Sequence, residues 1–314
     1  MAELYEGDLL EALSLYDWDY SNSPSVKRAI RSMNYYLDGN GDYGPISGLN
    51  SADGIVHVTL YHFAYWVMAA REPRAPMLDL AQRMQFLAQV GRKFRFDENP
   101  QHLTPSLPEY GETILQLIAT GRDDLLGPTE QIALGVLQSG RYVKREGTGG
   151  FFIQPSKIGV FALEALAATR NETIDWESFH VPPDRFWLDC ARVGVTEPDP
   201  AKAAQWGHDL CEAHLNTLQR DVDNGTMTAA TGHEINAEAH FLWPITVHAF
   251  LRLRAQLGLQ TAEIDHPLMR TSFAIMRDWT MPAGAWQIEP WFTEILDKTV
   301  SAAPSLTPQV DLIR

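Results

Sequence analysis

The sequence predicts an all-α fold, organised as a single large multi-helix domain with room for one short β-hairpin. Apolar residues recur at helical spacing through most of the 314-residue chain. Hydrophobic residues make up 45% of the composition, which is enough to build a sizeable core. Glycines, prolines and polar clusters separate segments of helix length, and no glycine/serine-rich or proline-rich linker divides them.

The expected helices of the N-terminal half lie between residues 23 and 140. Ser23 is a typical N-cap residue, and Pro24 suits the first turn of a helix. Val26, Ile30, Met33 and Leu37 then follow at helical spacing. Residues 52–73 are too long and too apolar for one strand, so they predict a buried helix. Further helices are expected over residues 75–94, 106–121 and 127–140.

The C-terminal half predicts five more helical segments. One begins at Asp199 and Pro200 and ends near Asn224 and Gly225. Pro244 should break the segment 233–259, because a proline removes a backbone donor and clashes with the preceding turn. The remaining expected helical segments cover residues 157–171, 266–280 and 285–300.

Two parts of the chain predict something other than helix. Residues 140–154 are compatible with a short hairpin or with a long loop around the turn at 146–150. The same turn is the place where a weak waist would divide the domain. The tail, residues 301–314, contains prolines and is expected to be loose.

The formal net charge of −15 narrows the classes of partner. A nucleic-acid-binding protein needs a basic face, and an anionic membrane surface would repel this chain, so we expect neither partner. The same charge would attract a basic protein and speed its encounter. Two cysteines outside any CxxC pair, an acidic N-terminus unlike a signal peptide and the lack of a membrane-length apolar run predict a cytoplasmic protein.

The stretch "YLDGNGDYGPISG" begins like a calcium loop. Asp38, Asn40 and Asp42 occupy alternate positions, as the first ligands of an EF-hand do. However, Tyr43 stands where the loop needs glycine, and Leu49 stands where it needs a bidentate carboxylate. We therefore predict a polar connector between helices.

Other patterns for catalysis or metal binding are incomplete. His233 and His240 would lie about 10 Å apart along a helix, too far to share one zinc ion. The glycine-rich "REGTGGFF" lacks the lysine and hydroxyl of a phosphate loop. Cys190 and Cys211 lie within helical patterns and are expected in the core. The sequence thus predicts no catalytic set, no metal ligands and no cofactor, and we expect a protein that is not an enzyme.

Acidic residues next to aromatic ones suggest a partner surface instead. Asp17 and Asp19 flank Trp18, which would also suit a sugar-cleaving site, but carboxylates two residues apart share a face only in an extended chain. Carboxylates with exposed aromatic rings suffice to capture a basic domain, although each cluster could equally be a solvated face that serves solubility. The candidate contact residues are Asp17, Trp18, Asp19, Asp38, Asp42, Tyr43, Asp221 and Asp223.

Two stretches carry a resemblance to a known family. The first, residues 157–187, has a helix of small and apolar residues, a charged turn and then an aromatic residue with a double proline. The second, residues 241–269, contains "WP", a helix bearing "LRLR" and then "DHPLM". Together they resemble the all-helical immunity proteins of bacterial polymorphic toxin systems, in particular the immunity protein 49 family. The resemblance covers roughly the C-terminal half.

The resemblance implies a cytoplasmic immunity protein that binds a cognate bacterial toxin and occludes its active site. An acidic inhibitor would pair with a basic toxin, such as a nuclease or a nucleotide-dependent transferase. Two alternatives stay open: a helical bundle or toroid enzyme acting on a carbohydrate or lipid-like substrate, and a helical scaffold or regulatory subunit.

Overall fold

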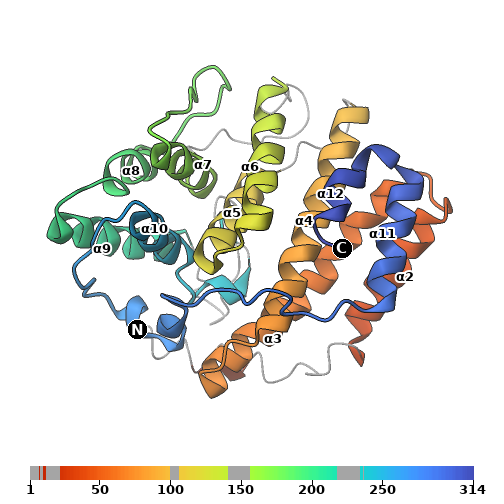
Figure 1. The fold of residues 1–314 in the computed structure, drawn as a ribbon, viewed down its shortest axis with the longest axis horizontal. Coiled ribbons are helices and arrows are strands. Elements are labelled where there is room, and N and C mark those ends of the chain that lie inside the picture. The colour runs from red at the N-terminus through yellow and green to blue at the C-terminus, as the bar shows by residue number, and fades with distance from the viewer. Residues whose placement is uncertain are drawn as a thin grey trace, which may run out of the picture. The chain divides into compact units, whose positions relative to one another are not determined.

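The computed structural model confirms the all-α prediction for the part of the chain that it describes (Figure 1). Apart from one isolated bridge, between Ser156 and Pro183, the secondary structure in this part is helical. Among the same residues, no helix combines the length and the apolar character that crossing a membrane requires. The described residues are 7, 10–11, 22–99, 106–140, 156–217, 234–235 and 237–314.

Contacts divide the chain into two compact units whose segments alternate along the sequence. The first unit draws on Ser106–Asp123 and Ala133–Thr280. The second draws on residues between Gly7 and Pro105, on Asp124–Ile132 and on Met281–Arg314. The predicted hairpin and waist at 146–150 lie outside the described residues, so both stay predictions.

The first unit is a helical cluster in which α5 packs against α7 and α10, and α9 packs against α10. Two of its long helices, α5 and α9, begin at residues whose side chains cap them. The Ser106 hydroxyl accepts from the Glu109 N–H, and the Asp199 carboxylate accepts from the N–H groups of Ala201 and Lys202. The helices are α5 (Leu107–Thr120), α7 (Ile158–Thr169), α8 (Arg185–Asp189), the π-helix η3 (Cys190–Gly194), α9 (Pro200–Asn216), α10 (Ile245–Gln256) and the 3₁₀ turns η4 (Glu238–His240), η5 (Pro267–Arg270) and η6 (Ser272–Met276).

Glycines let α5 and α7 approach closely at one point. A Cβ on Gly111 would lie 2.6 Å from the Cα of Gly159, and one on Gly159 would lie 2.8 Å from the carbonyl oxygen of Leu107. Real side chains never come that close to a backbone, so both positions require glycine. The contact brings the backbone of α7 against the start of α5.

The second unit pairs α3 with α4, and α2 packs against η2 and α11. The predicted start of α2 is confirmed, with Ser23 at the N-cap position and Pro24 as the first helical residue. The helix α6 (Asp123–Gln138) contributes residues to both units. The helices of the second unit are α2 (Pro24–Leu37), η2 (Pro45–Ala52), α3 (Asp53–Ala70), α4 (Ala75–Glu98), α11 (Pro290–Ala302), η7 (Pro304–Leu306) and α12 (Thr307–Asp311).

The segment 266–280 differs from the helix expected there. It forms the two short turns η5 and η6, separated at Thr271, whose ψ of 174° is extended. The Thr271 hydroxyl lies within hydrogen-bonding distance of the carbonyls of Leu242 and Leu268, which competes with continuation of the helix. The expected helix is therefore interrupted at Thr271, whose hydroxyl bonds to the distant Leu242 carbonyl as well as to one in its own turn.

The C-terminal tail also differs from the loose segment expected there. After α11 the chain continues through η7 and α12, and Ile313 is fully buried. Arg83 donates to the Ile313 carbonyl at 2.8 Å, while its guanidinium is fixed by the buried carboxylate of Asp79 at 3.0 Å. Asp79 also accepts from the N–H of Trp286 at 3.1 Å. Prolines in the tail begin short helices and do not keep it open.

Substitution of Ile313 tests whether this tail is part of the core. Ile313→Ala should lower the free energy of unfolding in urea by about 2–5 kcal/mol, because it removes fully buried methyl groups. The adjacent Leu312 is 43% exposed, so Leu312→Ala should change stability by no more than about 0.5 kcal/mol. Equal effects of the two substitutions would contradict the docked tail.

Candidate functional site

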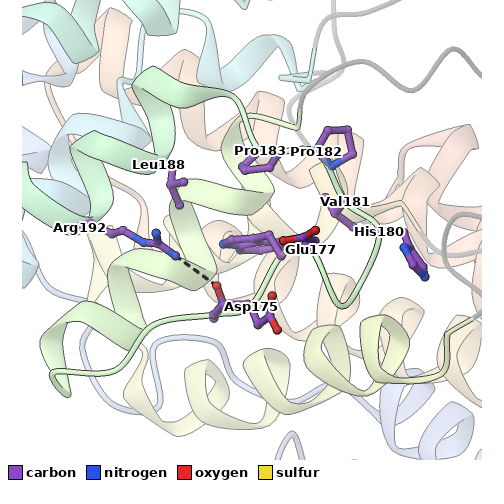
Figure 2. A pocket seen from close by; sticks show the side chains of 10 residues that line it. Asp175, Glu177, His180, Val181, Pro182, Pro183, Leu188 and Arg192 are labelled. Carbon is purple, nitrogen blue, oxygen red and sulfur yellow. Dashed lines mark hydrogen bonds between the residues drawn. The ribbon is translucent and has the colours of Figure 1, made fainter.

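A pocket of about 610 Å³ lies in the first unit, between the loop that follows α7 and the face of α8 and η3. Its volume falls within the roughly 300–1,000 Å³ typical of ligand sites. Figure 2 shows Arg192 and Leu188 on one side and His180 and the two prolines on the other. The pocket is lined by Ile174, Asp175, Trp176, Glu177, His180, Val181, Pro182, Pro183, Leu188 and Arg192.

Beneath the pocket, a fully buried carboxylate holds its parts together. Glu164 of α7 accepts from the Trp176 indole N–H at 2.6 Å and from the Arg192 Nε–H at 2.7 Å. The backbone N–H of Ile174 completes its shell at 3.3 and 3.4 Å. Burial of a charged group is costly unless it is paired and hydrogen-bonded, and Glu164 has both kinds of partner. The loop after α7 and the π-helix, two segments of the pocket, therefore depend on one side chain.

The loop of the pocket is closed by its own hydrogen bonds. The N–H groups of His180 and Val181 donate to the carbonyls of Glu177 and Trp176, at 3.0 and 3.1 Å. Asp175 accepts from the N–H of Ser178 at 3.2 Å. His180 has a φ of +57°, a left-handed conformation that residues other than glycine seldom adopt and that often marks functional loops. The loop is thus shaped before any ligand arrives.

The wall of the pocket opposite this loop includes the π-helix η3. The N–H of Val195 bonds to the carbonyl of Cys190 across five residues, and this widened turn carries Arg192. The fully buried Arg254 of α10 donates to the carbonyls of Gly194 and Val195, at 3.0 and 3.1 Å. It also donates to the Gln260 carbonyl and the Thr261 hydroxyl. Arg254 thereby satisfies the carbonyls at the end of the π-helix.

Two exposed carboxylates give the pocket its charge. Glu177 has no hydrogen-bond or ion-pair partner among the described residues, and Asp175 bonds only to the neighbouring Ser178 N–H. Arg192 contributes a positive charge to the pocket lining, and the Glu164 carboxylate balances this charge. The Nη2 of Arg192 donates to the Ile174 carbonyl at 3.2 Å (Figure 2). The pocket therefore combines an apolar lining with a net negative rim.

Of the partner residues expected from sequence, the three that the structure describes, Asp38, Asp42 and Tyr43, do not line this pocket. Asp17, Trp18, Asp19, Asp221 and Asp223 lie outside the described residues, so their role stays a prediction.

The polar connector at 38–48 is placed in the second unit. Asp38 pairs with Lys298 of α11 at 2.9 Å, which ties the connector to that helix. Asp42 and Tyr43 are exposed, and Tyr43 reaches 69% exposure. Asp42 and Tyr43 thus remain accessible to a partner, whereas Asp38 already has an internal one.

One signal in the sequence could have pointed to the pocket. "ESFH" is a Glu-x-x-His pair, Glu177 and His180, and both side chains line it. Such a pair binds metal in helical bundles, where both residues project from one helix face. Here the pair lies in a non-helical turn, and no group of three metal-ligating side chains occurs among the described residues. The double proline of the stretch 157–187 forms part of the same wall.

Three histidines of the first unit, His214, His240 and His248, are buried and do not line the pocket. His240 lies 2.6 Å from Glu112 and 2.9 Å from Gln116, both on α5. His214 contacts the His240 carbonyl, and His248 accepts from the Trp243 indole at 3.2 Å. The two cysteines are free and buried, and burial raises the pKa of both thiols. The expectation of core cysteines is confirmed for Cys190 and Cys211.

Comparisons with protein families, with characterised proteins and with solved structures found no match to this chain. The resemblance to immunity proteins therefore stays a prediction.

Acid should destabilise the chain through two of these histidines. Burial is the main cause that lowers the pKa of His214 to about 4 and of His248 to about 3. Neighbouring ionisable groups contribute to both values, and a hydrogen bond to the His240 backbone opposes the shift of His214. Unfolded histidines take up a proton near pH 6.5. Their contribution is therefore complete above pH 6.5 and is lost as the pH falls toward 4, by about 1.4 kcal/mol per pH unit for each histidine.

Urea unfolding between pH 8 and pH 4.5 measures this slope. His248→Asn keeps an acceptor for the Trp243 indole but cannot be protonated, so it should flatten the pH dependence by about half. The exposed His180→Asn is the matched control and should keep the wild-type slope. An unchanged slope for His248→Asn would contradict the assignment.

Removal of Glu164 should collapse the pocket. Glu164→Ala leaves Arg192 and the Trp176 indole without their acceptor, which should cost about 3–5 kcal/mol of unfolding free energy. Glu172, whose ion pair with Arg170 is exposed, provides the control, since Glu172→Ala should cost no more than about 1 kcal/mol. Similar losses in the two variants would show that Glu164 has no special role.

Proposed function

We propose that this chain is an immunity protein that binds a basic bacterial toxin and blocks its activity, with the pocket at 174–192 as its anchor point. The observation that supports this most directly is the pair of uncompensated carboxylates, Asp175 and Glu177, on a pre-shaped loop around an apolar pocket. Binding hot spots pair buried anchor side chains with such pockets, and charged rims guide the approach.

Two further points agree with this proposal. The net charge of −15 favours association with a basic partner over an acidic one. Most of the pocket lining comes from the stretch 157–187, one of the two that resemble immunity proteins. The second stretch, 241–269, supplies Arg254, which supports the π-helix that carries Arg192. The rigid loop would bind with little ordering cost, because its hydrogen bonds already exist in the free protein.

The first experiment is co-expression with the product of the neighbouring gene. The proposal expects the two proteins to co-purify and the chain to protect cells from that product. A neighbour that neither binds this chain nor harms cells lacking it would refute the proposed function.

Charge reversal at the pocket then tests the anchor. Asp175→Lys with Glu177→Lys should weaken binding of the toxin at least tenfold, through slower association and also through faster dissociation, because these carboxylates would both guide the approach and pair with the bound partner. The matched control is Glu263→Lys with Asp278→Lys, two exposed carboxylates of the first unit that do not line the pocket. This control carries the same change in net charge, so it should alter only the association rate.

The connector predicted from sequence enters the same assay as a third variant. Asp42→Lys with Tyr43→Ala is preferable to replacing Asp38, because a lysine at 38 would face Lys298. Weakening by the connector variant alone would place the interface on the second unit and remove the pocket from it.

A further inference from the structure

The pocket at 174–192 has features that select one kind of side chain. Its lining contains Leu188, Val181 and the two prolines, which are apolar, and its rim carries Asp175 and Glu177. An occupant must therefore present an aliphatic stem and a cationic end. Lysine and arginine both have this form, since each buries its methylene groups while its charge stays at the surface.

The charge balance around the pocket favours a cation despite the presence of Arg192. The Nε of Arg192 lies 2.7 Å from Glu164, and its Nη2 donates to the Ile174 carbonyl, so its charge and two of its donors are already used. Glu164 itself is fully buried and cannot reach a ligand. Asp175 and Glu177 are left to set the sign of the potential that a ligand meets.

The geometry of the acceptors favours a guanidinium over an ammonium. The Glu177 carboxylate has no partner within the described residues, so both of its oxygens can accept the paired N–H groups of a planar guanidinium. A guanidinium is also less strongly hydrated than an ammonium, so it loses less on leaving water for the apolar surface of Pro182 and Pro183.

We propose that the pocket receives an arginine side chain of the partner protein, held by Glu177 and Asp175 with its stem against the prolines and Leu188. This inference rests on the proposed function for the source of the arginine, but the chemistry of the pocket can be tested without a toxin.

The test is a titration of the 314-residue chain with N-acetyl-arginine amide, monitored by NMR of the ¹⁵N-labelled protein. The citrulline counterpart has the same shape without the charge, and the lysine counterpart has the charge without the planar group. The arginine probe should shift the amide resonances of residues 174–192. The citrulline probe should bind roughly tenfold more weakly, and the lysine probe should fall between them.

Variants of the rim complete the design. Glu177→Gln and Asp175→Asn should each weaken the arginine probe about fivefold and leave the citrulline probe unchanged. Glu172→Gln is the matched control, because Glu172 is exposed, pairs with Arg170 and does not line the pocket. Equal affinities for arginine and citrulline, or shifts confined to other parts of the chain, would overturn the proposal.

The outcomes separate this inference from the proposed function. One outcome is that the toxin binds the wild-type chain, that charge reversal weakens this binding, and that the arginine probe does not bind. This outcome would support the proposed function and refute the proposal that the pocket receives an arginine. If the chain binds the arginine probe but neutralises no toxin, the proposed function is refuted and the proposal that the pocket receives an arginine is supported.

Discussion

The first unit depends on the burial of one carboxylate. Glu164 has no exposed surface, so each of its lone pairs must be matched by a donor inside the protein. The donors come from the backbone of Ile174, the indole of Trp176 and the guanidinium of Arg192, which are separated by up to 28 residues from Glu164. Because a charge stranded in the core would be costly, satisfying Glu164 fixes the path of the loop and the position of the π-helix together.

A second buried charge supports the same wall in a different way. Arg254 donates to neutral oxygen acceptors from Gly194, Val195, Gln260 and Thr261, and the Glu197 carboxylate adds a favourable electrostatic interaction. A guanidinium with several fixed donors suits this arrangement, whereas a lysine would present a single ammonium. The π-helix leaves carbonyls that an ordinary helix would have used, and Arg254 uses them. The two arginines thus have different roles. Arg254 stabilises the π-helix from within the core, and Arg192 projects from the π-helix into the pocket.

The distribution of charge carries more information than its total. A net charge of −15 describes the whole chain, and most acidic residues at a surface serve solubility. Asp38 is already neutralised by Lys298, and Glu172 by Arg170. Glu177 and Asp175 differ because they surround an apolar pocket on a rigid turn, where a bound cation would lose less entropy and gain more contact.

The sequence by itself determined the all-α class, the helix starts at Pro24 and Pro200 and the break at Pro244, because caps, prolines and helical periodicity act over a few neighbouring residues. It did not determine the docked tail or the split of segment 266–280, since these depend on Arg83 and Leu242, which lie far away in the chain. It also did not determine the two units, whose segments alternate along the sequence. The pocket belongs to the same category. Its residues lie within 174–192, but only the folded chain brings Glu164 beneath them and Arg254 behind them, and a buried carboxylate cannot be distinguished from a solvated one by sequence alone.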